Sequence, residues 1–140
     1  MHKNTLNELA NALLNTIQEL EPNPIPNEYV EMKSISFDSY EEYQEFLVRY
    51  LNKAKTFEIH CWNEEEEWIA LASRYGKIKR SNWQYGKVIE GEVTLEFTCM
   101  LLSLTKPQDT KIYNKMTPFF NIFMDDVFQS CHYGTEIYYR

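Results

Sequence analysis

The sequence predicts an α+β fold, a single domain over residues 1–140 in which about four helices pack on a mainly antiparallel sheet. Apolar residues recur at helical spacing in the first half of the chain, whereas residues after Lys77 alternate with a period of two. The expected elements also lack the regular helix–strand alternation of a parallel doubly wound sheet. A chain of 140 residues has the size of one ordinary domain.

The first expected helix covers residues 5–21, where a capping box precedes leucines at helical spacing. Three prolines between residues 22 and 26 end it, because proline has no amide hydrogen to donate and forces extended backbone. An irregular alternation over residues 30–37 indicates a strand. A second capping box at Ser39 then opens a helix with an unambiguous apolar stripe, made of Tyr43, Phe46, Leu47, Tyr50, Leu51 and Ala54.

Residues 57–62 alternate as a strand with one buried face would. Asn63 is the expected N-cap of the next helix, and Gly76 its left-handed stop. A long β-hairpin is predicted from residues 78–89 and 92–104, turning at Glu90 and Gly91. Thr117 and Pro118 are expected to begin a last helix that ends before Gly134, and residues 136–139 to form an edge strand.

The net charge of −7 argues against nucleic acid and anionic lipid as partners, since both attract clustered Lys and Arg. The negative charge is concentrated in residues 1–67, which carry 14 acidic against 5 basic side chains. Three cysteines, an odd number in apolar surroundings, predict buried free thiols: Cys61, Cys99 and Cys131. With no apolar stretch suited to a signal peptide or a membrane span, the expected location is the cytoplasm.

Two local clusters contain reactive or metal-binding residue types but match no known site, so no cofactor, metal or catalytic residue is expected. His60 and Cys61 are adjacent on a strand and point to opposite faces, and their spacing matches no zinc motif. Cys131 and His132, with Asp125 and Asp126 nearby, match no nucleophile signature. Only four glycines occur, and no phosphate-binding or dinucleotide motif.

Residues 77–87 interleave bases with Trp83 and Tyr85, a combination used to bind single-stranded nucleic acid. The acidic field of the whole chain opposes that function. The alternative is an exposed hairpin arm whose Lys and Arg protect a sheet edge from unwanted pairing. We take the alternative as the prediction.

Surplus carboxylates at two helix entrances, with aromatic residues nearby, predict binding to a basic protein. The candidate contact residues are Asp38, Glu41, Glu42, Glu45, Glu64, Glu65, Glu67 and Trp62. The first hypothesis is a non-enzymatic inhibitor that covers the basic active site of a nuclease toxin, the general character of bacterial immunity proteins and antitoxins. Two alternatives stay open: a ligand-binding or enzymatic domain with a pocket around Trp62 and Trp83, and a protein that homo-oligomerises through residues 135–140.

Overall fold

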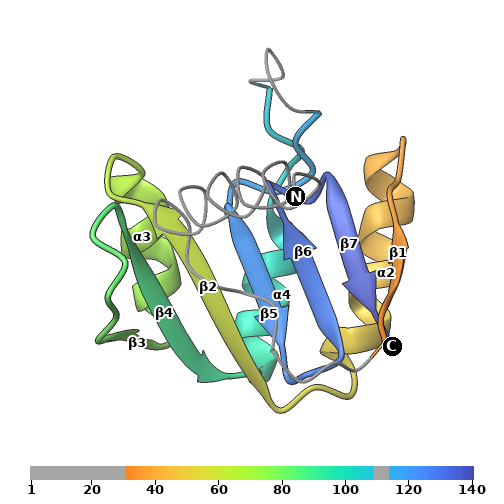
Figure 1. The fold of residues 1–140 in the computed structure, drawn as a ribbon. Coiled ribbons are helices and arrows are strands. Elements are labelled where there is room, and N and C mark those ends of the chain that lie inside the picture. The colour runs from red at the N-terminus through yellow and green to blue at the C-terminus, as the bar shows by residue number, and fades with distance from the viewer. Residues whose placement is uncertain (1–30, 109–113) are drawn as a thin grey trace, which may run out of the picture.

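The computed structural model describes residues 31–108 and 114–140 (Figure 1). The expected helix over residues 5–21 and the proline connector lie outside the described residues. Ten elements follow one another in the order β1 (Lys33–Ile35), α2 (Tyr40–Leu51), β2 (Thr56–Trp62), α3 (Glu66–Ser73), β3 (Lys77–Lys79), β4 (Gly86–Glu92), α4 (Leu95–Ser103), β5 (Asn121–Met124), β6 (Phe128–Cys131) and β7 (Glu136–Tyr139).

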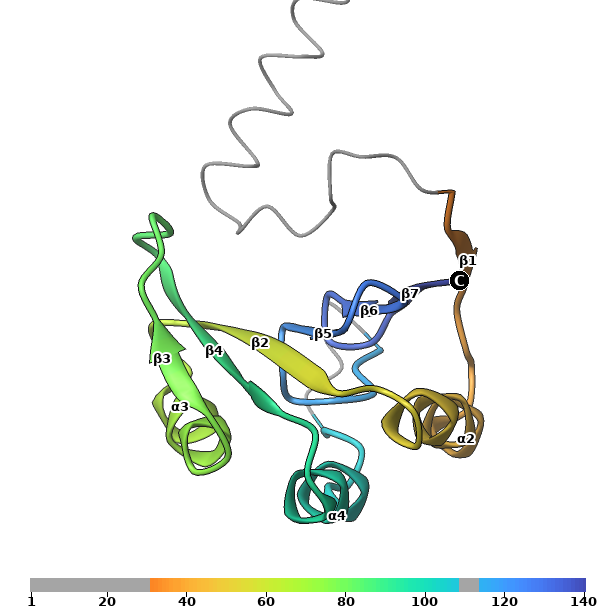
Figure 2. The ribbon, with the colours of Figure 1, turned by 90° about the horizontal axis from the view of Figure 1, so that it is seen from below.

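The seven described strands form one sheet in the order β1-β7-β6-β5-β2-β4-β3, and every pairing is antiparallel. The three described helices all pack on one face of this sheet (Figure 2). The predicted α+β class with an antiparallel sheet is therefore confirmed. We call the sheet surface away from α2, α3 and α4 the far face.

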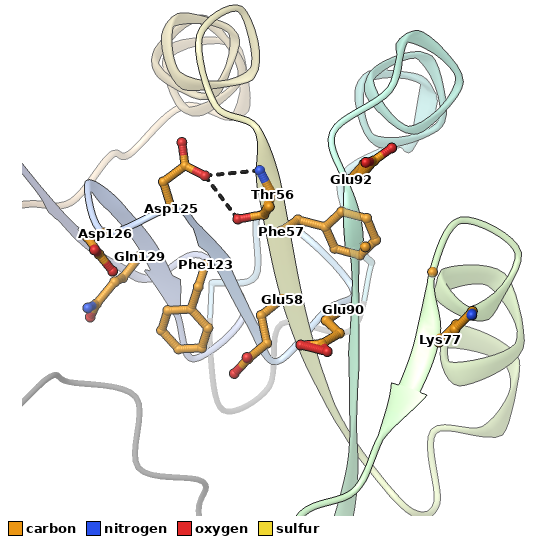
Figure 3. Close-up of a pocket in the computed structure, with 12 residues that line it drawn as sticks. Thr56, Phe57, Glu58, Lys77, Glu90, Glu92, Phe123, Asp125, Asp126 and Gln129 are labelled. Carbon is orange, nitrogen blue, oxygen red and sulfur yellow. Dashed lines mark hydrogen bonds between the residues drawn. The ribbon is translucent and has the colours of Figure 1, made fainter.

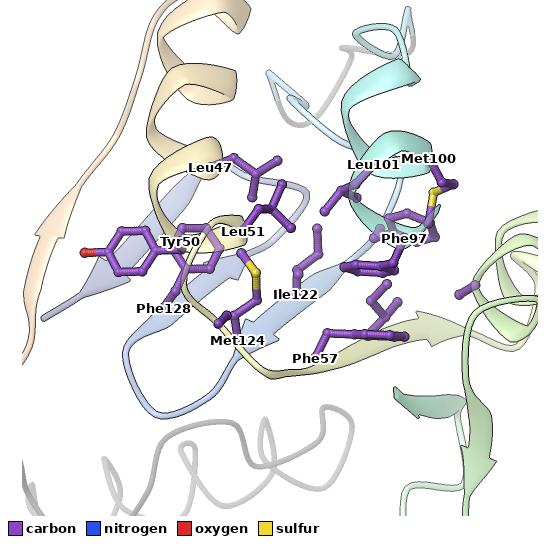
Figure 4. Packing of buried hydrophobic residues seen from close by; sticks show 14 of the residues in the cluster. Leu47, Tyr50, Leu51, Phe57, Phe97, Met100, Leu101, Ile122, Met124 and Phe128 are labelled. Carbon is purple, nitrogen blue, oxygen red and sulfur yellow. The ribbon is translucent and has the colours of Figure 1, made fainter. Parts of the chain in front are cut away.

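The core lies between the three helices and the face of the sheet that they cover (Figure 4). α2 forms where predicted, because Ser39 caps it: its Oγ accepts a hydrogen bond from the backbone N–H of Glu42, 3.1 Å away. The stripe expected to face inward is buried throughout. Phe46 of α2 packs edge-on against Tyr139 of β7, with ring centroids 5.0 Å apart.

The predicted long hairpin is wrong in both arms. Its first arm, residues 78–89, is divided between β3 and β4, which pair with each other. Residues 95–103 form α4 instead of a strand, because Thr94 caps the helix by accepting a hydrogen bond from the backbone N–H of Phe97. Burial in α4 follows the helical spacing of Phe97, Met100 and Leu101, while Leu95 is exposed. The apolar alternation of residues 93–101 fits a helix as well as a strand, and packing on the sheet decided for the helix.

The predicted last helix is also wrong, because residues 121–131 form the β5–β6 hairpin. All eight residues of these two strands are buried. A strand covered on both faces shows no polar–apolar alternation, so its sequence was interpreted as helical. The turn between the strands begins at Asp125, which adopts a left-handed φ of 49°.

Three smaller expectations are corrected as well. Glu90 and Gly91 lie inside β4, where a Cβ on Gly91 would be 2.7 Å from the carbonyl oxygen of Tyr75. Glycine is thus needed for a close approach and not for a turn. Gly76 does not have the left-handed φ expected of a helix stop; Gly134 alone among the four glycines has a positive φ, of 81°. The N-cap of α3 is Glu65, not Asn63.

The C-terminal strand β7 is not at the edge of the sheet. It pairs with β6 on one side and with β1 on the other, so β1 and β3 are the two edge strands of the described sheet. Both edges are only three residues long, a length that limits pairing with another chain. Adding a strand of another chain to this side of β7 would therefore require that β1 be displaced.

Candidate functional site

Four polar or charged side chains of β2 and its neighbours share the far face. Glu58 lies opposite Glu90 of β4 and Phe123 of β5, and His60 lies opposite Asn121 of β5. These residues alternate with Phe57, Ile59 and Cys61, which point into the core beneath the helices. The far face thus brings together side chains that are more than 30 positions apart in the sequence.

A pocket of about 790 Å³ lies at the end of the sheet where β2 begins, and we call it the acidic pocket (Figure 3). Five carboxylates contribute to its lining, against Lys77 as the single lysine. They come from β2, β4 and the turn after β5, and are Glu58, Glu90, Glu92, Asp125 and Asp126. Phe57, Phe123 and Gln129 add apolar and amide surface.

Glu58 and Glu90 lie directly opposite each other on neighbouring strands, an arrangement in which like charges repel. Lys79 relieves part of the repulsion, since its Nζ is 3.2 Å from Glu58 Oε1 and 3.6 Å from Glu90 Oε2. The pKa of Glu58 is held below its usual range by the hydrogen bond from His60, against the opposing effect of burial, and by Lys79. Glu58 is therefore ionised at neutral pH.

Asp125 has a structural role in the rim of the acidic pocket. Its carboxylate accepts hydrogen bonds from the backbone N–H groups of Lys55 and Thr56 and from the Thr56 hydroxyl, at 2.9 to 3.2 Å. Burial opposes ionisation, but these hydrogen bonds outweigh it and lower the pKa of Asp125. Glu92 and Asp126 are exposed, as Asp125 is, and belong to the pocket lining.

The candidate residues at the first helix entrance are Asp38, Glu41, Glu42 and Glu45, in and before the first turns of α2. All four are exposed. The Oε2 atom of Glu41 accepts a hydrogen bond from the Ser39 hydroxyl at 3.3 Å, so part of this group supports the helix start. The remaining carboxylates form a solvated acidic face.

The candidate residues at the second entrance, before and in α3, have two different roles. Glu64 and Glu67 are exposed. Glu65 is half-buried and engaged at both carboxylate oxygens, which accept from the backbone N–H of Trp62 and from the hydroxyl of Tyr133, each at 2.8 Å. Glu65 therefore joins α3 to the turn after β6, a role its place in a run of four glutamates does not reveal.

Both helices begin at the end of the sheet where β2 finishes, opposite the acidic pocket. The width of the sheet separates them, because α2 packs on the β6–β7 side while α3 packs against β4 and β2 (Figures 1 and 2). The structure does not bring the two predicted acidic groups into one patch. Each is a separate acidic surface.

The aromatic residues of the alternative ligand pocket pack against one another. Trp62 and Trp83 meet edge to face with centroids 5.0 Å apart, and Phe120 lies 4.9 Å from Trp62. Trp83 is buried, and neither tryptophan lines the acidic pocket. This cluster fills space on the far face.

The basic segment before β4 lies at a sheet edge, as the edge-protection interpretation expects. Lys77, Ile78 and Lys79 form the edge strand β3. Lys79 is paired with carboxylates, and Lys87 donates to Asn63 at 3.3 Å. Trp83 is buried and so unavailable for stacking on a base.

The cysteines are free, but only two of the three are buried. Cys61 and Cys131 lie inside, whereas Cys99 is exposed on α4, because the helix turns it away from the face that Phe97 occupies. The prediction of three buried thiols is wrong for Cys99. His132 is joined to Glu136, with 2.5 Å between Nδ1 and Oε2, and not to the aspartates of the rejected nucleophile hypothesis.

The sequence interpretation missed the acidic pocket, although it had singled out Asp125 and Asp126 for another reason. Glu90 and Glu92 belong to the half of the sequence with a net positive charge, and Glu58 stands alone in its strand. Their convergence depends on strand register, which one sequence does not reveal. The adjacent aspartates Asp125 and Asp126 were the usable signal, since Asp tolerates the left-handed conformation of a tight turn.

No group of three or more His, Cys, Asp or Glu side chains within residues 31–108 and 114–140 is arranged to hold a metal ion. None of the described helices has the length and apolar character needed to cross a membrane.

Comparison with known proteins gives no relative: no family model matches the chain, and neither the curated proteins nor the solved structures contain a significant match.

Proposed function

We propose that this protein binds a basic protein partner, and that the acidic pocket receives lysine or arginine side chains of that partner. The observation that carries the proposal is the pocket lining, in which five carboxylates from three segments face one lysine. A partner cation would relieve the repulsion between Glu58 and Glu90 that Lys79 relieves only in part.

The pocket has a size and a chemistry suited to long basic side chains. Its volume of about 790 Å³ accommodates more than one side chain. The ring of Phe123, which lies opposite Glu58 on the far face, offers apolar surface for the methylene stems of Lys or Arg, while the carboxylates hold the charged ends.

The two helix-entrance surfaces serve the same function at longer range. Exposed carboxylates on α2 and before α3 extend a negative field that attracts a basic partner and speeds encounter. Such fields act over about 8 Å at physiological salt, so they need not touch the partner. In this proposal the pocket provides the contact and the entrances provide steering.

An acidic protein that occupies the basic active site of a nuclease would exclude the nucleic acid substrate, which is how an immunity-type inhibitor works. We therefore propose a stoichiometric, non-enzymatic inhibitor as the biological role. The cytoplasm is the proposed location, because all three thiols are free.

The test compares two variants of equal charge. Glu92→Lys with Asp126→Lys alters the exposed rim of the pocket, and Glu42→Lys with Glu45→Lys alters the α2 surface. Each pair changes the net charge from −7 to −3, since every replacement adds two positive charges. Partners are first captured from the native organism on the wild-type protein, and their association and dissociation rates are then measured with all three proteins at low and high salt.

The pocket variant is expected to dissociate at least tenfold faster at both salt concentrations, because a contact is lost. The α2 variant is expected to lose association rate only, by a factor that shrinks as salt screens the field. Equal losses in both variants would show that the pocket is not a contact. Capture of a partner that is not basic would contradict the proposal as a whole.

A further inference from the structure

A chain of hydrogen bonds runs from the acidic pocket through a buried histidine to a strained turn. His60 Nε2 lies 2.7 Å from Glu58 Oε2, and His60 Nδ1 lies 3.2 Å from Asn121 Nδ2. The backbone N–H of His132 donates to Asn121 Oδ1 at 3.2 Å. His60 and Asn121 are only 1% and 2% exposed, so water does not compete for these bonds.

The backbone N–H of His132, at the end of this series of hydrogen bonds, determines which atom is the donor in each of them. Because that N–H of His132 is a donor, Asn121 must present its oxygen there and its NH₂ group to His60. His60 Nδ1 is then an acceptor, and Nε2 carries the ring proton and donates it to Glu58. The chain is satisfied throughout only while His60 is neutral.

The turn at the far end depends on bonds from outside itself. His132, Tyr133 and Gly134 have φ values of 52°, 63° and 81°, three left-handed residues in succession. For a residue other than glycine this conformation costs about 1 kcal/mol or more. The backbone N–H groups of His132 and Tyr133 are held by Asn121 Oδ1 and by the carbonyl of Phe120, the latter at 2.9 Å.

We propose that His60 and Asn121 form a pH-sensitive switch: when Nδ1 of His60 takes up a proton, the Asn121 amide must rotate, and the turn at residues 132–134 loses the acceptor that holds it. The new N–H of His60 would otherwise point at the NH₂ of Asn121, leaving two buried donors face to face. After rotation, the Asn121 oxygen accepts a hydrogen bond from Nδ1–H of His60. The NH₂ group of Asn121 then faces the backbone N–H of His132, which is also a donor, so that bond is lost.

The surroundings of His60 contain few other charges. On its own strand it faces Glu58, and Lys79 of β3 reaches it through Glu58, with Glu90 of β4 beyond. Its remaining neighbours carry no charge: Val88 of β4, Trp83 before β4 and Phe123 of β5. Burial lowers the pKa of His60, although the hydrogen bond and charge of Glu58 oppose this, so the switch operates on the acid side of about 6.5.

The test follows the backbone amide of residue 132 by NMR in the full chain. The variant His132→Asn is the starting protein, because it removes the imidazole of residue 132 itself while asparagine tolerates the left-handed φ. Ring signals of His60 and the protection of the residue-132 amide against hydrogen exchange are recorded from pH 7.5 downward. The protection factor is expected to fall about fivefold with the midpoint of His60, the effect of losing one hydrogen bond.

Two further variants in the same background separate the switch from general acid effects. His60→Gln cannot titrate, so the amide should stay protected over the same pH range. Asn121→Asp supplies a carboxylate that accepts from both sides, so His60 should titrate at higher pH while the amide stays protected.

Three results would overturn the proposal: an amide that stays protected while His60 titrates, a loss of protection that persists in His60→Gln, or a His60 that remains neutral until the protein unfolds. If Asn121→Asp fails to fold, the comparison with His60→Gln still shows whether the loss of amide protection depends on His60.

Discussion

The ring of Phe57 on β2 stacks on the ring of Phe97 on α4, with centroids 3.9 Å apart and planes 7° from parallel. The contact joins the middle of the sheet to the helix that replaces the expected hairpin arm. Phe97 is fully buried, and Tyr75 approaches it edge-on from the end of α3. This stack and the Thr94 cap both favour the helix over a strand at residues 95–103.

Phe97 and Leu95 should therefore respond differently to truncation. Phe97→Ala is expected to cost about 3–5 kcal/mol of unfolding free energy, because it removes a fully buried ring. Leu95→Ala should change stability by less than about 0.5 kcal/mol, since Leu95 is 74% exposed. Urea unfolding measures both. In a strand the two residues would share one face, so similar losses would contradict the helix.

Thiol labelling should reveal one fast cysteine and two slow ones. Cys99 is exposed on α4, whereas Cys61 and Cys131 are buried, and burial raises the pKa of the Cys61 thiol. A neutral-pH reaction with an aromatic disulfide reagent is expected to release one equivalent rapidly. Cys99→Ser should abolish that phase and leave the slow phases unchanged. Three slow thiols would show that α4 is misplaced.

Glu65 should stabilise the fold more than its neighbours in the glutamate run. Glu65→Ala is expected to cost about 1–3 kcal/mol, because it leaves the Trp62 N–H and the Tyr133 hydroxyl without their acceptor. Glu67→Ala, in the same helix turn, should cost less than about 1 kcal/mol. A double-mutant cycle of Glu65→Ala with Tyr133→Phe should give a coupling energy of about 1 kcal/mol. Zero coupling would show that the hydrogen bond between the Tyr133 hydroxyl and Glu65 does not stabilise the fold.

Asp125 should make stability depend on pH in the acid range. Its folded-state pKa is lowered, so its contribution is present above the unfolded-state pKa of about 3.9 and is lost as the pH falls below that value. Asp125→Asn keeps a residue that accepts the left-handed φ and should cost about 1 kcal/mol at pH 6, a value reduced by solvent exposure. Chemical unfolding at pH 6 and pH 3 should show a smaller difference at pH 3, because the contribution is lost as the pH falls from the unfolded-state pKa through the lowered folded-state pKa. A difference that is equally large at pH 3 would assign the effect to shape alone.

The sequence by itself determined α2, β2 and the α+β class. The cap at Ser39 and the stripe that includes Phe46 are local signals, and β2 alternates because its two faces meet different surroundings. In these segments the local preference and the tertiary packing agree, so a single sequence is sufficient.

The tertiary structure alone decided the elements around Phe97 and Asn121, and with them the acidic pocket. Residues 95–103 suit a helix or a strand, and stacking on Phe57 selects the helix. Residues 121–131 do not show the polar–apolar alternation of a strand, because both faces of β5 and β6 are buried. Glu58, Glu90 and Asp126 converge through strand pairing over long sequence separations, and that pairing is set by the whole sheet, not by any one segment.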